Sequence, residues 1–132
     1  GRDRRQRQMC IRDRNERMHL MFFIEIAKPS LFERILVLGA QFVFGIFYFF
    51  MYLIFPKTSH RMIGYFEDEA VKSYSEYLRL VQSGAVENIA APKLAIDYYN
   101  LKSDAKLSDL IERVRADEMH HSETNHKYAV DL

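Results

Sequence analysis

Cysteine is nearly absent from this sequence of 132 residues, which contains only Cys10. A single cysteine excludes an intramolecular disulfide framework and any zinc or iron–sulfur site built from several cysteines. A metal site in this chain would therefore use carboxylates and histidines, a ligand set that suits iron or manganese.

Long runs of alternating apolar and polar residues are also missing, which argues against β-strands and predicts an all-α fold. The patterns predict helices over 15–27, 30–55, 59–82 and 105–129, with a connection at 85–104 that holds a short helical turn within 87–99. The residues expected to cap or end these helices are Asn15, Pro29, Ser30, Pro56, Ser59, Ser83 with Gly84, and Ser103 or Asp104.

Basic residues show no concentration outside the first fourteen positions. Residues 1–14 contain six arginines and two aspartates, whereas the other 118 residues carry 13 basic and 16 acidic side chains. The main part of the chain therefore has no basic stripe, and we expect no nucleic-acid partner. The head has no serine and two aspartates, unlike a transit peptide. We predict that 1–14 is a non-native head, with a genuine basic arm as the alternative, and that 15–132 is the functional domain.

One segment is long and uncharged. Residues 35–55 form 21 positions without a charged side chain, which meets the length of a membrane span. The alternative is the central core helix of a soluble bundle, but this helix is apolar on every side. We expect residues 30–55 to lie in one leaflet rather than cross the bilayer, because the flanking helices are too charged to enter hydrocarbon.

Two Glu-x-x-His motifs occur, Glu16 to His19 and Glu118 to His121. Positions i and i+3 of a helix share a face, so each pair can bind one ion. Two such pairs, with one glutamate from each of two further helices, form the ligand plan of ferritin-like di-iron proteins. Glu118 and His121 also fall in a stripe about 80° wide at 3.6 residues per turn, together with Leu107, Ile111, Val114 and Asn125.

A third helix carries His60, Glu67 and Tyr74 at intervals of seven residues, hence on one face. Glu67 is the candidate metal ligand of this helix, and Tyr74 is expected near the metal but beyond bonding distance. His60 could instead only cap or pack, and Tyr74 could only fill the core. Glu25 lies about 180° from Glu16 and is expected to point away.

Three segments resemble motifs of the mitochondrial alternative oxidases. Residues 15–20 resemble the NERMHL motif, residues 66–70 are similar to LEEEA, and residues 115–121 resemble RADEAHH. The resemblance implies a ferritin-like di-iron four-helix bundle with two non-haem irons. It further implies a respiratory enzyme that oxidises ubiquinol, reduces O₂ to water and pumps no protons. Such an enzyme is expected as a homodimer on the matrix side of the mitochondrial inner membrane.

The resemblance also assigns roles to individual residues. It implies the metal ligands Glu16, His19, Glu67, Glu118 and His121, the catalytic tyrosine Tyr74, the supporting side chains Asn15, Tyr98 and Asp117, and the quinol-pocket residues Glu69, Ala70 and Ser73. The family carries a sixth ligand, a glutamate, on a helix before the first motif, and residues 1–14 contain no glutamate. The bundle is therefore expected to be incomplete here and the isolated segment to be inactive.

Three other functions remain open at this point. A plastid-type quinol terminal oxidase and a di-iron hydroxylase of quinone biosynthesis use similar ligands. A structural or assembly membrane protein would explain the hydrophobic helix but not the two Glu-x-x-His faces.

Overall fold

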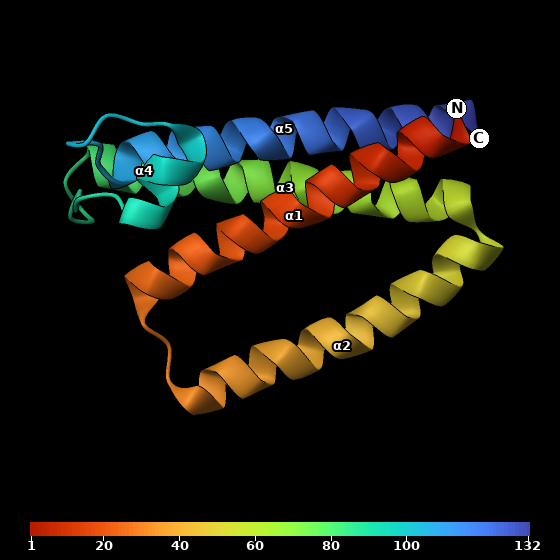
Figure 1. Ribbon diagram of the computed structural model, residues 1–132, viewed down its shortest axis with the longest axis horizontal. Coiled ribbons are helices and arrows are strands. Elements are labelled where there is room, and N and C mark those ends of the chain that lie inside the picture. The colour runs from red at the N-terminus through yellow and green to blue at the C-terminus, as the bar shows by residue number, and fades with distance from the viewer.

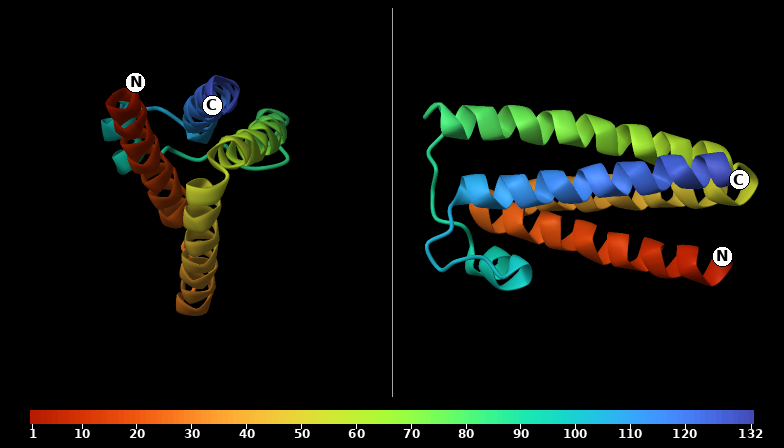
Figure 2. Two further views of the ribbon diagram at one scale, coloured as in Figure 1. Left: turned by 90° about the vertical axis from the view of Figure 1, so that its right-hand side faces the viewer. Right: turned by 90° about the horizontal axis from the view of Figure 1, so that it is seen from above.

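The computed structural model describes residues 1–132 and confirms the all-α fold. Its five helices are α1 (Arg2–Ala27), α2 (Leu31–Ile54), α3 (Pro56–Gln82), α4 (Lys93–Tyr99) and α5 (Leu107–Asp131). The long helices α1, α3 and α5 lie lengthwise beside one another, and both termini lie at the same end (Figure 1). Viewed end-on, α2 projects away from this group (Figure 2). The only β-type pairing is an isolated bridge between Ala90 and Lys106.

Some predicted helix ends are confirmed. Ser30 caps α2, because its hydroxyl accepts from the N–H of Glu33 while the Glu33 carboxylate accepts from the N–H of Ser30. Helix α1 ends before Pro29, with Lys28 in the left-handed region. Helix α3 ends at Gln82, and Gly84 follows at φ 84°, a conformation that glycine adopts without a steric cost.

Three predicted helix starts are wrong. Helix α1 begins at Arg2, so Asn15 is a buried mid-helix residue and not an N-cap. Helix α3 begins at Pro56, whose fixed φ suits the first helical position, and Ser59 lies buried within that helix. Helix α5 begins at Leu107 after Lys106, whose N–H donates to the Asp109 carboxylate at 2.8 Å, so neither Ser103 nor Asp104 caps it. The division of the chain after residue 14 stays a prediction, and α1 runs through that point without a break.

The apolar core lies toward the end of the bundle where α4 packs against the long helices. Phe22 of α1 and Leu110 of α5 are completely buried in it. The other buried members of this cluster are Leu78, Val81, Ala95, Leu107, Ile111 and Val114. This core fixes α1, α3 and α5 relative to one another, while the polar cluster described below lies further along the same helices.

Helix α2 has no buried residue, so the alternative that it forms the core of a soluble bundle is wrong. By length and composition it could cross a membrane. It touches the bundle along one side, where the ring of Phe44 lies 6.0 Å from that of Phe66 and Tyr52 lies 5.4 Å from His60. The rest of its aromatic and aliphatic surface is exposed.

Candidate metal centre

Three helices bring four acidic and imidazole side chains together. Glu16 of α1, Glu67 of α3, and Glu118 and His121 of α5 each offer one ligand atom, and these atoms all lie within 4.8 Å of one another. Glu67, Glu118 and His121 are buried, and Glu16 is partly exposed. Oxygen and imidazole ligands at this spacing could hold a metal ion.

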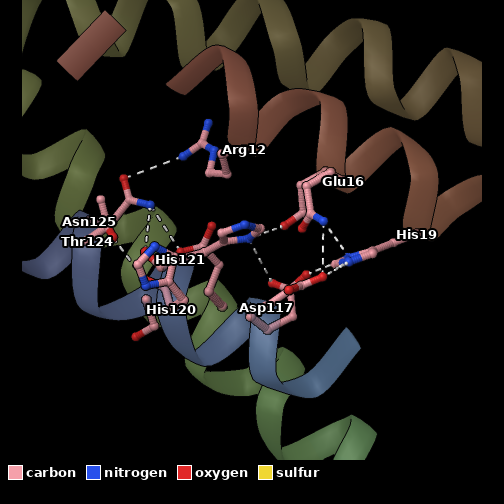
Figure 3. Close-up of polar contacts among 12 residues, drawn as sticks. Arg12, Glu16, His19, Asp117, His120, His121, Thr124 and Asn125 are labelled. Atoms are coloured by element: carbon pink, nitrogen blue, oxygen red, sulfur yellow. Dashed lines mark hydrogen bonds and ion pairs between the residues drawn. The ribbon is translucent and has the colours of Figure 1, made fainter. Parts of the chain in front are cut away.

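The α5 members reach the centre for the reason that their periodicity indicated. Val114, Glu118, His121 and Asn125 are all buried, so the polar groups continue the apolar stripe into the bundle interior. The Nδ1 atom of His121 lies 2.9 Å from Oε1 of Glu16, which joins α5 to α1 (Figure 3). Glu25 is exposed, as predicted.

His19 stands beside the four-residue cluster rather than within it. Its Nδ1 lies 3.1 Å from Oε1 of Glu118, and its Nε2 lies 2.9 Å from Oδ2 of Asp117 (Figure 3). The ring is buried. His19 therefore touches both a cluster carboxylate and a second carboxylate outside the cluster, and its role as a ligand stays a prediction.

A partly buried hydrogen-bond network holds Asp117 in place. The Nδ2 group of Asn15 donates to Tyr98 Oη at 2.9 Å and to Asp117 Oδ2 at 3.0 Å. Tyr99 also donates to Asp117 Oδ2, at 2.5 Å, and its hydroxyl lies 2.9 Å from His19 Nε2. The structure thus joins the three predicted supporting side chains, and it adds Tyr99, which sequence reasoning missed because α4 shows no periodicity that singles it out.

Burial and mutual charge shift the pKa values of these groups in opposite directions. Burial raises the pKa of Glu67 to about 7 and also raises that of Glu118. Burial acts against the charged form of His19, but hydrogen bonds to Asp117, Glu118 and Glu16 raise its pKa to about 11. For Glu16, burial is outweighed by hydrogen bonds from His121 and His19, which lower its pKa. The carboxylates thus lie close enough to oppose one another's ionisation, and His19 supplies one positive charge beside them.

Tyr74 lies beside the cluster, as its heptad position predicted. It lines an open hollow of about 530 Å³ together with Glu16 and His19. Its ring stacks on Phe23 at a centroid distance of 5.8 Å. Burial, followed by the charges of Glu118 and Glu16, raises the pKa of Tyr74 to about 12, so the phenol keeps its proton at neutral pH.

The predicted quinol-pocket residues do not all lie together. Ala70 lines a second hollow of about 300 Å³, whose wall also includes Glu16, Glu67 and Glu118. Glu69 is exposed and pairs with Lys72 at 2.7 Å, and Ser73 is exposed as well. Only Ala70 therefore borders the cluster in this structure, and the pocket assignment stays a prediction.

Two further polar side chains reach the cluster from its other end. Asn125 donates to Glu67, and His60 contacts Asn125. Arg12, in the segment to which the sequence assigned no function, donates to Asn125 Oδ1 at 3.4 Å. Asn125 carried a signal in the sequence, because it lies in the same stripe as Glu118 and His121, whereas nothing in the head marked Arg12.

This chain is an all-α bundle in which Glu-x-x-His motifs contribute side chains to an interior carboxylate–histidine centre. These features define the class of ferritin-like carboxylate proteins. The family model for alternative oxidase matches residues 3–130. The chain belongs to the alternative oxidase family.

Individual relatives agree with this family. The chain is 52% identical over 118 residues to the mitochondrial ubiquinol oxidase 2 of Glycine max, covering 89% of this chain and 35% of the relative. It is 53% identical over 118 residues to ubiquinol oxidase 1a of Arabidopsis thaliana, covering 89% of this chain and 33% of that relative. It is 50% identical over 115 residues to the ubiquinol oxidase of Batrachochytrium dendrobatidis, covering 87% of this chain and 36% of that relative. The chain thus spans about a third of the length of the curated relatives it matches.

Proposed function

We propose that the full-length protein is a ubiquinol:oxygen oxidoreductase with a non-haem di-iron centre, on the matrix side of the mitochondrial inner membrane. The observation that carries the proposal is the approach of Glu16, Glu67, Glu118 and His121 to within 4.8 Å in a member of the alternative oxidase family. The similar proteins are mitochondrial ubiquinol oxidases, which supports ubiquinol as the substrate and the mitochondrion as the compartment.

The donor set fits iron. Three carboxylates gathered in one buried site repel one another, and a cation between them would offset that repulsion. Carboxylate and imidazole together suit iron, and the site has no thiolate that would favour zinc or copper. We assign Glu16, His19, Glu67, Glu118 and His121 as the iron ligands in this segment.

In the proposed reaction two ubiquinols give up four electrons and four protons, and O₂ becomes two waters. The bound irons would supply the redox chemistry of O₂ reduction. Tyr74 is placed to give an electron and the proton on its hydroxyl, because it borders the same hollow as Glu16 and His19. Ala70 would contact quinol in the neighbouring hollow beside Glu67.

Helix α2 gives the proposed route for a lipid-soluble substrate. It lies lengthwise beside α1 and α3 rather than across them (Figure 1). If α2 crossed a bilayer, α1 and α3 would be carried into hydrocarbon with their charges. We therefore propose that α2 lies in one leaflet, with its exposed apolar side in lipid and the Phe44 side against the bundle.

The test compares wild-type full-length protein with His121→Ala and the matched control Glu25→Gln. We expect the wild type and the exposed-site control to bind iron and to consume O₂ with ubiquinol, and His121→Ala to lose both. Plastoquinol tests the plastid-type alternative, and a hydroxylated quinone product would indicate the hydroxylase. Unchanged iron content and O₂ uptake in His121→Ala would contradict the assignment.

A further inference from the structure

His60 is the one member of the His60–Glu67–Tyr74 face that the proposed chemistry leaves unused. It lies on α3 near the α2 junction and is completely buried. Its ring contacts Tyr52 and Tyr128 edge-on at 5.4 and 5.3 Å. Its Nδ1 lies 2.9 Å from Oδ1 of Asn125, whereas its Nε2 is buried without a hydrogen-bond partner.

Asn125 connects this imidazole to the metal centre. Its Nδ2 group donates to Oε2 of Glu67 at 3.1 Å and to the backbone oxygen of His121 at 3.0 Å. Both amide hydrogens are thus used, and both go to residues that we assign as ligands. Its Oδ1 faces His60 and also receives the longer contact from Arg12, at 3.4 Å.

The hydrogen-bond roles in this chain of contacts have only one consistent direction. An amide oxygen can only accept, so His60 Nδ1 must carry the hydrogen and the neutral ring must leave Nε2 bare. If the Asn125 amide turned over, its oxygen would face the Glu67 carboxylate and its nitrogen would face the donor on His60. The Glu67 carboxylate and the backbone oxygen of His121, which only accept, therefore set which end of Asn125 faces Glu67, and the hydrogen on His60 Nδ1 stabilises the opposite end of the amide.

We propose that His60 and Asn125 are positioning residues that hold the Glu67 carboxylate in a fixed orientation for metal binding. The Asn125 amide donates a hydrogen bond to Oε2 of Glu67, and Oε1 of Glu67 accepts no hydrogen bond from the protein. Hydrogen bonds to metal-ligating carboxylates orient them, and loss of such a partner lowers metal affinity about 10–100-fold. The inference rests on the proposed metal centre and adds the pair that sets one of its ligands.

The test uses the full-length protein, stripped of metal and titrated anaerobically with ferrous ion against a chelator. His60→Leu removes the donor and keeps most of the volume. His60→Asn restores a donor, because Nδ2 of asparagine and Nδ1 of histidine are the same number of bonds from Cβ. Ser59→Ala is the matched control, since Ser59 is equally buried and its hydroxyl has no partner. Asn125→Ala tests the pair from the other helix.

We expect His60→Leu and Asn125→Ala to weaken ferrous-ion binding at least 10-fold. We also expect each to alter the Mössbauer spectrum of the iron that still binds. His60→Asn should recover most of the affinity, and Ser59→Ala should match the wild type. Thermal unfolding of the metal-free proteins separates loss of fold from loss of orientation. Wild-type affinity in His60→Leu, or failure of His60→Asn to recover affinity while folding normally, would overturn the inference alone. Absence of iron from the wild type would overturn the proposed function and this inference together.

Discussion

Gly64 on α3 lies directly against the imidazole of His126 on α5. A Cβ at this position would lie 2.7 Å from Cε1, 2.8 Å from Nε2 and 2.9 Å from Nδ1 of that ring, all closer than real Cβ contacts allow. Gly64 is one helical turn from Glu67, so the packing that it permits also sets how near Glu67 lies to the ligands on α5. We therefore expect Gly64→Ala to push the two helices apart or to displace His126.

The expected magnitude follows from three contributions. Alanine is favoured over glycine in a helix interior by about 1 kcal/mol. Forcing a methyl group into a packed contact costs about 1–3 kcal/mol. A displaced His126 also loses its 3.0 Å contact with Asp68, which contributes about 1 kcal/mol or less because both side chains are partly exposed. These contributions sum to a cost of about 0–3 kcal/mol, so Gly64→Ala should lower the free energy of unfolding by roughly 1.5 kcal/mol.

Gly45→Ala on α2 is the matched control, because a Cβ there meets no atom within 4 Å. It should keep the helix-propensity gain, so the two variants should differ in stability by about 1–4 kcal/mol. The assay is thermal unfolding of the full-length protein in detergent, followed by far-UV circular dichroism, with Gly64→Val as a larger perturbation. Equal stability of Gly64→Ala and Gly45→Ala would show that Gly64 is not needed for the close packing of α3 against His126.

Three further predictions concern the site and its support. Tyr74→Phe should keep its iron but lose most quinol oxidation, because Tyr74 lines the hollow beside Glu16 and His19 and its hydroxyl makes no hydrogen bond to either; undiminished O₂ uptake would reduce Tyr74 to a packing residue. Phe22→Ala should destabilise the protein by about 3–5 kcal/mol in denaturant titration. Its completely buried ring packs against Tyr98 and Tyr99 at 5.7 Å, and a loss below about 1 kcal/mol would contradict this. Residues 1–132 alone should bind fewer than two irons and oxidise no quinol, since only three helices supply ligands and the Glu16 side chain is 40% exposed. Binding of two irons with quinol oxidation by this segment alone would contradict the prediction.

Periodicity accounts for the part of the site that the sequence predicted. The stripe on α5 placed Glu118 and His121 in the interior because apolar neighbours at helical spacing must be buried, and they carry the polar groups with them. The heptad spacing on α3 likewise predicted that His60, Glu67 and Tyr74 share a face. Glu16 and His19 followed from their i, i+3 spacing once α1 was recognised as a helix.

The failures have other causes, among them tertiary contacts that override local signals and segments too short or too polar to show an apolar period. Asn15 looked like a helix cap because asparagine favours that position, yet its amide is used by Tyr98 and Asp117 within the bundle. The first turns of α1 lack an apolar stripe, but arginine and glutamine are good helix formers. This part of α1 also contacts α5, through Arg5 over the ring of Tyr128 and through Arg12 at Asn125. Tyr99 reaches Asp117 from a seven-residue helix too short to show a period.

Iron content measured together with Mössbauer spectroscopy on the purified full-length protein tests the central claim most directly. We expect about two irons per chain in a coupled non-haem centre. We further expect that Glu67→Ala loses this centre and that Glu25→Gln retains it. Protein that oxidises ubiquinol at full rate without iron, or a Glu67→Ala variant with an unaltered iron spectrum, would contradict the proposed di-iron centre.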